Sequence, residues 1–370
     1  MIKGLCRIAA LFAAMAIFRG YCYGYDYPKQ SVYGDWSFIE NSDGTLTIVW
    51  YNGNEEYIEI PQEIRGDTVT AIGQSAFSGC ESAREIIVPE SVTYIDKSAF
   101  LNCENLQRVN IPWGVYFIGG SAFSGCSSLK SIVIPGNVEY LGSNAFEGCV
   151  SLEQATLYDG VITIGERAFS GCGHLTEITL PSSVQSVGEG AFENCAYLEE
   201  VYWSESADTI PENCFSGCKD LNWVELPEGL LYINDKAFDG CMRIGRIVIP
   251  ASVIGIHTGA FPESNNLILH CHMGTYGESF AKEHEYRLWL IDDDLAMSGE
   301  GNIAVTEDSG QDDIVVEEYE PEVLEDNSGI LVIVLCSWVF VAAAVILCVV
   351  IAKKRENKRL SPCNRNKKSV

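Results

Sequence analysis

The chain has 370 residues, with 51 acidic against 24 basic side chains and a formal net charge of −27 at pH 7. A surface with this excess of negative charge repels phosphate backbones, which excludes nucleic acids as partners. The sequence contains no nucleophile elbow, phosphate-binding loop, zinc-protease helix or dinucleotide fingerprint. We therefore expect a binding or structural protein rather than an enzyme, and no cofactor.

Residues 1–24 predict a secretory signal peptide. Lys3 and Arg7 precede an apolar run over residues 8–18, which is too short to span a bilayer. Cleavage after Gly24 would place Cys22 at the minus-three position. A lipid anchor on Cys22 is the alternative, although the residues before it lack the usual lipidation context.

Residues 25–66 predict a small set of paired strands. Turn dipeptides at Asp43-Gly44 and Asn52-Gly53 separate short runs rich in aromatic and β-branched residues, which is typical of β-hairpins. The expected strands are Trp36–Ile39, Thr45–Trp50 and Ile58–Pro61.

Residues 67–272 contain an internal repeat with a period of 23. A fixed period in the twenties predicts a solenoid, whose stacked turns form a long recognition surface more often than a catalytic pocket. The period is carried by nine phenylalanines: Phe77, Phe100, Phe123, Phe146, Phe169, Phe192, Phe215, Phe238 and Phe261.

Other columns of the repeat follow the same spacing. The residue before each Phe is Ala, except for Cys214 in the seventh repeat, and the residue five positions before Phe is always aliphatic. Gly or Asn stands two positions after Phe, which predicts a left-handed residue that ends a short helical turn. Three positions after Phe is a column of cysteines: Cys80, Cys103, Cys126, Cys149, Cys172, Cys195, Cys218 and Cys241.

After the Gly or Asn the periodicity changes to alternation. Leu129, Ile132 and Ile134 illustrate the pattern, and Pro135 follows them. Such alternation predicts a half-buried strand that the proline ends. Each turn should contain a strand, a bend, a second extended piece and a short helical turn. The expected fold is a mainly β leucine-rich-repeat solenoid of nine repeats.

The repeat pattern Leu-x-x-Ile-x-Ile-Pro-x-x-Val-x-x-Ile-Gly-x-x-Ala-Phe-x-Gly-Cys resembles the 23-residue leucine-rich repeat of BspA-like surface proteins, over residues 55 to 291. The resemblance implies an N-terminal β cap at 25–66. It also implies a C-terminal cap at 273–291, with a helix at Tyr276–Lys282 and a strand at Tyr286–Leu290. As a function it implies adhesion to host matrix proteins, mucins or other cells.

Residues 292–370 predict a membrane anchor. Residues 292–326 hold 14 acidic and no basic residues, so 292–329 should be a disordered stalk; calcium binding is the alternative, without the usual ligand spacing. The apolar run 330–352 is long enough for one transmembrane helix. The basic tail, 353–370, then lies in the cytoplasm and the solenoid outside the plasma membrane. Binding of anionic lipid or a cytosolic partner by the tail is an alternative role.

The cysteine column predicts a buried ladder of free thiols, because its position beside Phe and Ala requires a small apolar side chain. Disulfides between neighbouring turns are the alternative, since the spacing of turns would permit them. His270-Cys271-His272 and His284 form the one cluster of metal-ligand chemistry in the sequence. We interpret it as polar exposure of a terminal strand, so no metal is expected.

Outward strand positions predict a candidate binding patch. Glu200, Tyr202, Trp223, Glu225 and Arg246 lie eight or ten positions after a repeat Phe, and aromatic residues flanked by charges resemble the anchors of binding surfaces. Sequence drift, with aromatics merely favoured in strands, is the alternative.

A second aromatic column contains Tyr94, Phe117, Tyr140 and Tyr232. We interpret it as shielding a second sheet, with stacking of sugar rings as the alternative. The expected partner of the protein is an extracellular protein or glycan. The runner-up function is a structural surface layer in which the repeats self-associate, and a signalling receptor is disfavoured by the short tail.

Overall fold

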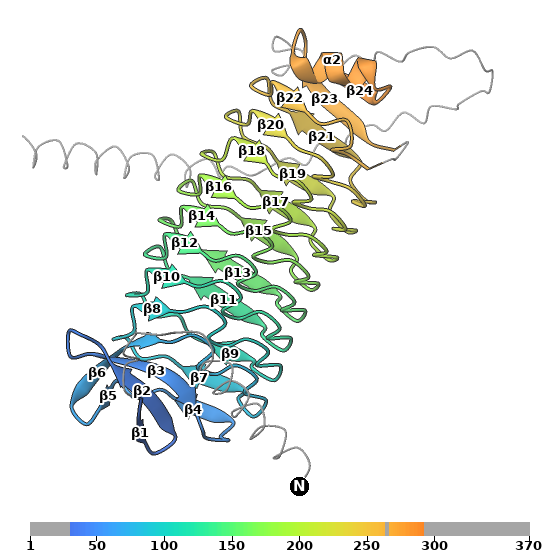
Figure 1. The fold of residues 1–370 in the computed structure, drawn as a ribbon. Coiled ribbons are helices and arrows are strands. Elements are labelled where there is room, and N and C mark those ends of the chain that lie inside the picture. The colour runs from blue at the N-terminus through green and yellow to red at the C-terminus, as the bar shows by residue number, and fades with distance from the viewer. Residues whose placement is uncertain (1–29, 263–265, 292–370) are drawn as a thin grey trace, which may run out of the picture. The chain divides into compact units, whose positions relative to one another are not determined.

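The computed structural model describes residues 30–262 and 266–291, all within one compact unit, residues 1–306. They form a mainly β solenoid with the leucine-rich-repeat fold, in which each turn of chain stacks on the previous one (Figure 1). The predicted signal peptide, stalk, transmembrane helix and tail lie outside the described residues. In the part of the chain that is described, no helix is long and apolar enough to cross a membrane.

One side of the solenoid is a ladder of parallel strands, which we call the strand face. Neighbouring strands are joined by hydrogen bonds in four groups, β4-β7-β9, β11-β13, β15-β17-β19 and β21-β23-β24. Its eleven strands are β4 (Tyr57–Glu59), β7 (Glu85–Ile87), β9 (Arg108–Val109), β11 (Ser131–Ile134), β13 (Gln154–Leu157), β15 (Glu177–Thr179), β17 (Glu200–Tyr202), β19 (Trp223–Glu225), β21 (Arg246–Ile249), β23 (Ile268–His272) and β24 (Arg287–Ile291).

A second row of shorter strands runs along another side of the same turns. Each is the second extended piece that the repeat predicts, and its inward residue is the aliphatic position five before Phe. The row contains β8 (Tyr94–Ile95), β10 (Phe117–Ile118), β12 (Tyr140–Leu141), β14 (Thr163–Ile164), β16 (Ser186–Val187), β18 (Thr209–Ile210), β20 (Tyr232–Ile233) and β22 (Gly255–Ile256).

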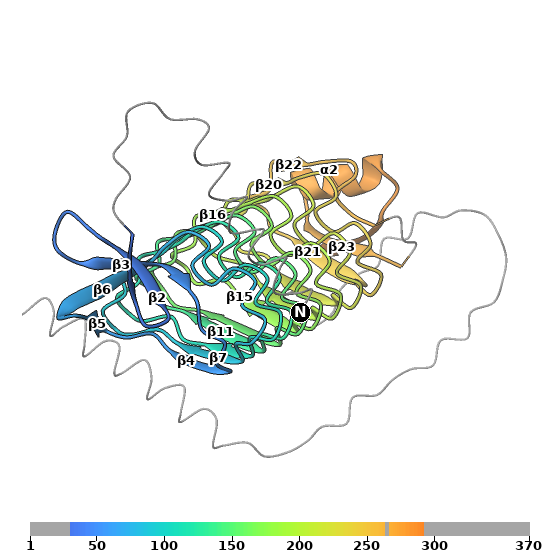
Figure 2. The same ribbon diagram turned by 60° about the horizontal axis from the view of Figure 1, so that its bottom comes forward.

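The two ends of the solenoid have additional elements. At the N-terminal end, β1 (Ser31–Tyr33), β2 (Trp36–Glu40) and β3 (Leu46–Tyr51) are antiparallel, and β3 then pairs in parallel with β6 (Asp67–Ile72), with β5 (Glu63–Ile64) beside it. At the other end, helix α2 (Tyr276–Glu283) packs beside β23 and β24. Figure 2 shows α2 at the end of the stacked turns, next to β22. Their role as caps stays a prediction.

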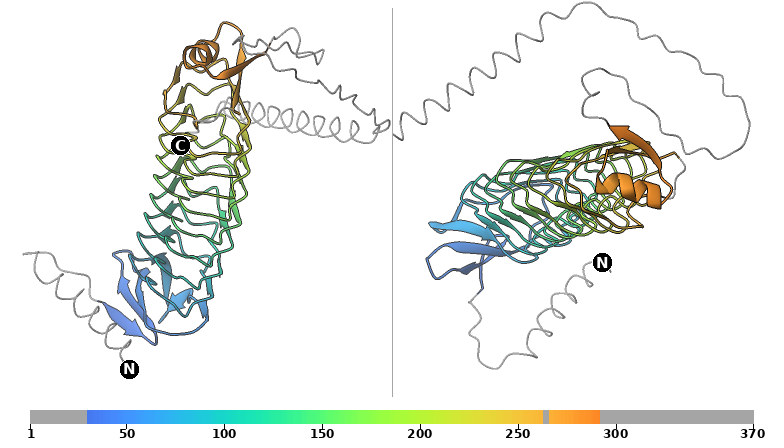
Figure 3. Two further views of the ribbon diagram at one scale, coloured as in Figure 1. Left: turned by 90° about the vertical axis from the view of Figure 1, so that its right-hand side faces the viewer. Right: turned by 90° about the horizontal axis from the view of Figure 1, so that it is seen from above.

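The third side of each turn differs from the expectation of a short helix. In the turn that holds Phe123, the Phe123 N–H donates to Ala145 O of the next turn at 2.7 Å, whereas the Ala122 N–H donates to Gly119 O at 3.2 Å. Successive N–H groups along this segment thus alternate: one donates to a carbonyl oxygen of the next turn, and the following one donates to a carbonyl oxygen of its own turn. The predicted helical turns are therefore wrong, and these segments are hydrogen-bonded turns stacked side by side (Figure 3).

In the turns from Phe77 to Phe238, two left-handed residues explain why no helix forms there. The Gly or Asn two positions after Phe has a positive φ, as predicted; Asn102, at φ 56°, is an example. The residue two positions before Phe is also left-handed, and the sequence did not indicate this, because Ser121, Arg167 and Lys236 occupy that position at φ 52–56°. A helix cannot propagate through such residues.

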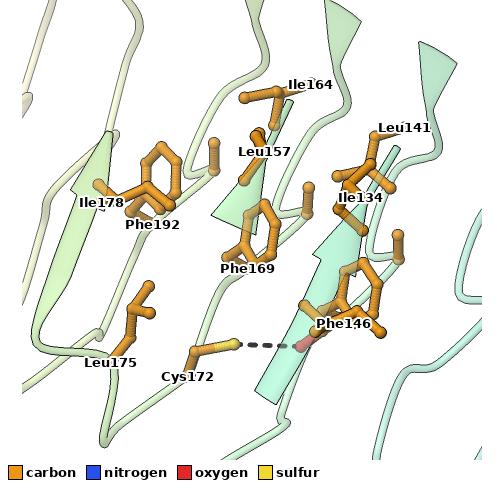
Figure 4. Close-up of a cluster of buried hydrophobic side chains, with 14 of the residues drawn as sticks. Ile134, Leu141, Phe146, Leu157, Ile164, Phe169, Cys172, Leu175, Ile178 and Phe192 are labelled. Carbon is orange, nitrogen blue, oxygen red and sulfur yellow. Dashed lines mark hydrogen bonds between the residues drawn. The ribbon is translucent and has the colours of Figure 1, made fainter. Parts of the chain in front are cut away.

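The phenylalanine column forms the centre of the core. Each ring stacks on the next at centroid distances of 4.9 to 5.8 Å and interplanar angles of 3 to 19°, from Phe77 to Phe261. Phe146 has no exposed surface. Figure 4 shows Phe146, Phe169 and Phe192 aligned one behind another between the two rows of strands.

The cysteine column lies next to the phenylalanines and forms a ladder of its own. The Sγ of Cys172 donates to the carbonyl oxygen of Phe146 in the preceding turn at 3.3 Å (Figure 4). The same bond, at 3.1 to 3.3 Å, recurs from Cys103 to Cys241. Burial raises the pKa of the Cys149 thiol to about 12. Among the described residues, Cys80 is half-buried, and all the other cysteines are buried free thiols.

A glycine column marks the closest approach of neighbouring turns. Four positions before Phe, a Cβ added to Gly165 would lie 2.5 Å from the backbone nitrogen of Ser143 in the preceding turn. The equivalent Gly119, Gly142 and Gly188 have similarly short distances to backbone atoms. At these positions glycine therefore permits a close contact between turns, whereas Asp96, Pro211, Asn234 and His257 occupy the equivalent position in other repeats.

Candidate functional site

The five predicted patch residues lie on three neighbouring strands of the strand face, β17, β19 and β21. Glu200 is opposite Trp223 and Tyr202 is opposite Glu225, so the two rings are diagonal neighbours. Between them, Val201 and Val224 point into the core and are 0% and 6% exposed. The alternation of these short strands therefore places all the polar and aromatic side chains on the outer surface.

Tyr202 is surrounded by carboxylates. Its hydroxyl donates to Glu200 Oε2 at 2.9 Å. This hydrogen bond, followed by the charge of Glu200 and smaller contributions from Glu177 and Glu225, raises the pKa of Tyr202. The phenol therefore stays a hydrogen-bond donor, and the three carboxylates create a negative potential around the ring. Tyr202 and its acidic neighbours can accept donors or cations from a ligand.

Trp223 has a different neighbour. The guanidinium of Arg246 lies over its indole, 4.8 Å from the ring centroid, within the range of a cation–π interaction. Trp223 is half-buried and Arg246 is exposed. The patch thus consists of an acidic half around Tyr202 and a Trp–Arg half, each with its own internal contacts rather than a shared aromatic cluster.

Two further residues, Glu177 and His270, adjoin the patch, and the sequence did not assign either of them to it. Glu177 pairs in register with Glu200; the 23-residue spacing between them was a signal that could have identified it. On the other side, His270 stacks on Trp289 of β24 at 5.7 Å and 12°. Burial and the nearby charge of Arg246 lower the pKa of His270. Trp289 follows His270 by 19 residues, so the 23-residue period could not reveal this contact.

The histidines near the C-terminal end have separate aromatic partners. His270 stacks on Trp289, whereas His284 packs on Phe280 of α2 with ring centroids 4.6 Å apart. Cys271 is buried on the opposite face of β23 from His270. Among the residues that the structure describes, no three His, Cys, Asp or Glu side chains are placed to hold a metal ion.

The second aromatic column lies on the row of shorter strands. Tyr94 stacks on Phe117 at 4.8 Å and 7°, and Phe117 on Tyr140 at 5.9 Å and 15°. Rings stacked in this way cover one another's faces and present their edges to solvent. Stacking of a sugar requires a free face, so this geometry favours the shielding interpretation over a sugar site.

A third aromatic feature lies at the bend between the two rows. Trp113 and Tyr158, two turns apart, meet edge to face at 5.0 Å with an interplanar angle of 70°. They are 54% and 46% exposed. In the turn between them, Gly136 stands 23 positions after Trp113, and Pro135 stands 23 positions before Tyr158.

Comparisons with known proteins agree with this architecture. The family model for the BspA type leucine-rich repeat region matches in six copies, over residues 49–162 and 141–268. A search of curated proteins found no match.

Among solved structures, the chain is similar to a leucine-rich repeat protein of T. pallidum, with 29% identity, coverage of 58% of this chain and 91% of that chain, and a TM-score of 0.45. It is also similar to a leucine-rich cell surface protein of Faecalibacterium prausnitzii, with 27% identity, coverage of 69% and 97%, and a TM-score of 0.34. A leucine-rich repeat protein of Bacteroides capillosus is 30% identical over 35% of this chain and 98% of that chain, with a TM-score of 0.32.

The matched residues extend over more than half of the chain and coincide with the stacked turns that hold the phenylalanine and cysteine ladders. The protein therefore belongs to the BspA type leucine-rich repeat family.

Proposed function

We propose that the protein is a single-pass plasma-membrane protein whose extracellular solenoid binds a protein or glycan ligand in adhesion. Membership of the BspA type family supports a binding function. The location rests on the sequence alone, on the signal at 1–24, the apolar run at 330–352 and the basic tail.

The observation that carries the proposal is the patch on β17, β19 and β21. It combines large rings, carboxylates and a guanidinium on a regular, rigid surface, and such compositions are typical of binding hot spots. Because the backbone of β17 is paired with β15 on one side and with β19 on the other, the part of the patch around Tyr202 loses little conformational freedom when a ligand binds.

The test is a binding screen of the full chain in a non-ionic detergent against matrix proteins, mucin, neutral glycans and the protein itself. The Tyr202→Ala/Trp223→Ala variant should bind the ligand at least about tenfold more weakly, since two hot-spot rings each contribute about 1 kcal/mol or more. Tyr140→Ala/Tyr232→Ala is the matched control, because it removes two exposed rings from the other row of strands.

The outcomes separate the hypotheses. If both variants and the wild type bind the ligand with equal affinity, the protein is still a binding protein, but the patch is not its binding site. Self-association as the one interaction detected would favour the structural surface layer instead.

A further inference from the structure

A hollow of about 460 Å³ lies at the N-terminal end of the strand face, away from the patch on β17–β21. It is formed where β4 and β7 end, and these two strands lie side by side (Figure 1). The residues around it are Glu59, Ile60, Pro61, Gln62, Ile87, Pro89 and Glu90.

The hollow follows from the way the two strands end. The Ile60 N–H donates to Ile87 O at 3.0 Å, which holds the two ends together. Pro61 and Pro89 then end both strands at equivalent positions. Ile60 is buried beneath the surface, whereas Ile87 points outward and is 48% exposed. Ile87 therefore gives the hollow an accessible apolar side chain beside its polar ones.

Two carboxylates at this hollow have no positive partner. Near the other ends of these strands, Arg84 Nε lies 3.1 Å from Glu56 Oε2, and Arg108 of β9 lies 2.7 Å from Glu85 Oε2. Glu59 and Glu90 are both exposed, and among the described residues neither forms an ion pair. Glu56 and Glu85 are thus neutralised by arginines, whereas the charges of Glu59 and Glu90 stay available to a ligand.

We propose that this hollow binds a lysine or arginine side chain from a basic segment of a protein partner. The apolar walls fit the methylene stem of such a side chain, which commonly packs along apolar surface while its charged end stays polar. The two carboxylates would pair with the ammonium or guanidinium group. The net charge of −27 would accelerate the approach of a basic partner and oppose that of an anionic one.

The test uses the full chain in non-ionic detergent with fluorescent hexalysine, hexaarginine and hexaglutamate peptides and a neutral hexasaccharide, maltohexaose. The proposal expects saturable binding of the two basic peptides alone. Glu59→Gln/Glu90→Gln should weaken that binding about fivefold, as expected for two exposed ion pairs. Ile87→Ser, which leaves the charge unchanged, should also weaken it.

The matched control is Glu205→Gln/Glu228→Gln. Both residues are exposed, both stand at the position of Glu90 in later repeats, and the variant removes the same charge. The control should bind within twofold of the wild type. Equal weakening by the two double variants would show diffuse attraction and overturn the site, as would preferential binding of maltohexaose or no saturable binding of the basic peptides. Circular dichroism checks that each variant is folded.

Discussion

The stack of phenylalanines makes the core sensitive to loss of a single ring. Phe146 is fully buried and stacks on Phe123 at 5.1 Å and on Phe169 at 5.3 Å. Phe146→Ala should reduce the free energy of unfolding by about 3 to 5 kcal/mol, the range for a buried Phe replaced by Ala. The loss of two stacking contacts, each contributing about 0.5 to 1.5 kcal/mol beyond burial, places the expected value in the upper part of that range.

The position along the stack provides an internal comparison. Phe261, at the C-terminal end, stacks on one ring of the column, Phe238 at 5.8 Å, and meets Phe280 and Tyr286 edge to face. Because repeat proteins are stabilised by nearest-neighbour contacts, Phe261→Ala should cost less than Phe146→Ala. It should also affect mainly the C-terminal turns.

Urea unfolding followed by circular dichroism gives the stability, and hydrogen exchange shows which turns open. Tyr232→Ala is the control, because this ring is 43% exposed and its loss should change the stability by no more than about 0.5 kcal/mol. A Phe146→Ala cost no larger than that of Tyr232→Ala would refute the argument that the ring stack holds neighbouring turns together.

Three further predictions test other columns of the repeat. Gly165→Ala should lower the free energy of unfolding by about 1 to 3 kcal/mol or more, because the added Cβ would lie 2.5 Å from the backbone of the preceding turn. Thermal unfolding measures this, and an unchanged Tm would contradict the close approach of the two turns. Asn102→Ala should lower the free energy of unfolding by about 1 kcal/mol and Asn102→Gly should hardly change it, since the φ of Asn102 is 56°. Equal losses for the two variants would exclude left-handed backbone strain as the cause of the destabilisation. For the thiols, burial raises the pKa of Cys149 from 9.0 to about 12. As the pH rises, the Cys149 thiol therefore loses its proton at a lower pH in the unfolded chain than in the folded one. Stability should then decline as pH rises from about 9 towards 12, by up to about 1.4 kcal/mol per pH unit for each such thiol. Cys149→Ala should show a shallower decline in urea unfolding at these pH values, and identical slopes would argue against a buried neutral thiol.

The periodicity was enough to predict the solenoid and its inward columns, because every turn repeats the same chemical environment. Phe, Ala, Cys and the aliphatic residues each recur where a side chain of one size must fit against the previous turn. The left-handed Gly or Asn after Phe was predicted on the same basis. The left-handed residue before Phe was not, since Ser, Asn, Arg and Lys at that position carry no common signal.

For the candidate patch, too, the sequence predicted the positions of the residues but not their contacts. Alternation along β17 and β19 was sufficient to place Tyr202 and Trp223 outward and on adjacent strands. It could not show that Tyr202 bonds to Glu200 or that Arg246 covers Trp223, because those contacts depend on side-chain conformations across turns.

The repeat, the residue types of the core columns and the outward position of the patch all follow from the 23-residue period, which can be seen along the chain without a structure. The conformation of the turns on the third side could not be predicted in this way, because their N–H groups form hydrogen bonds both within one turn and to the next turn. The same holds for the thiol-to-carbonyl ladder, the His270–Trp289 stack and the hollow between β4 and β7. In some of these features the two residues are not 23 positions apart. In the others the contact depends on how two turns pack against each other.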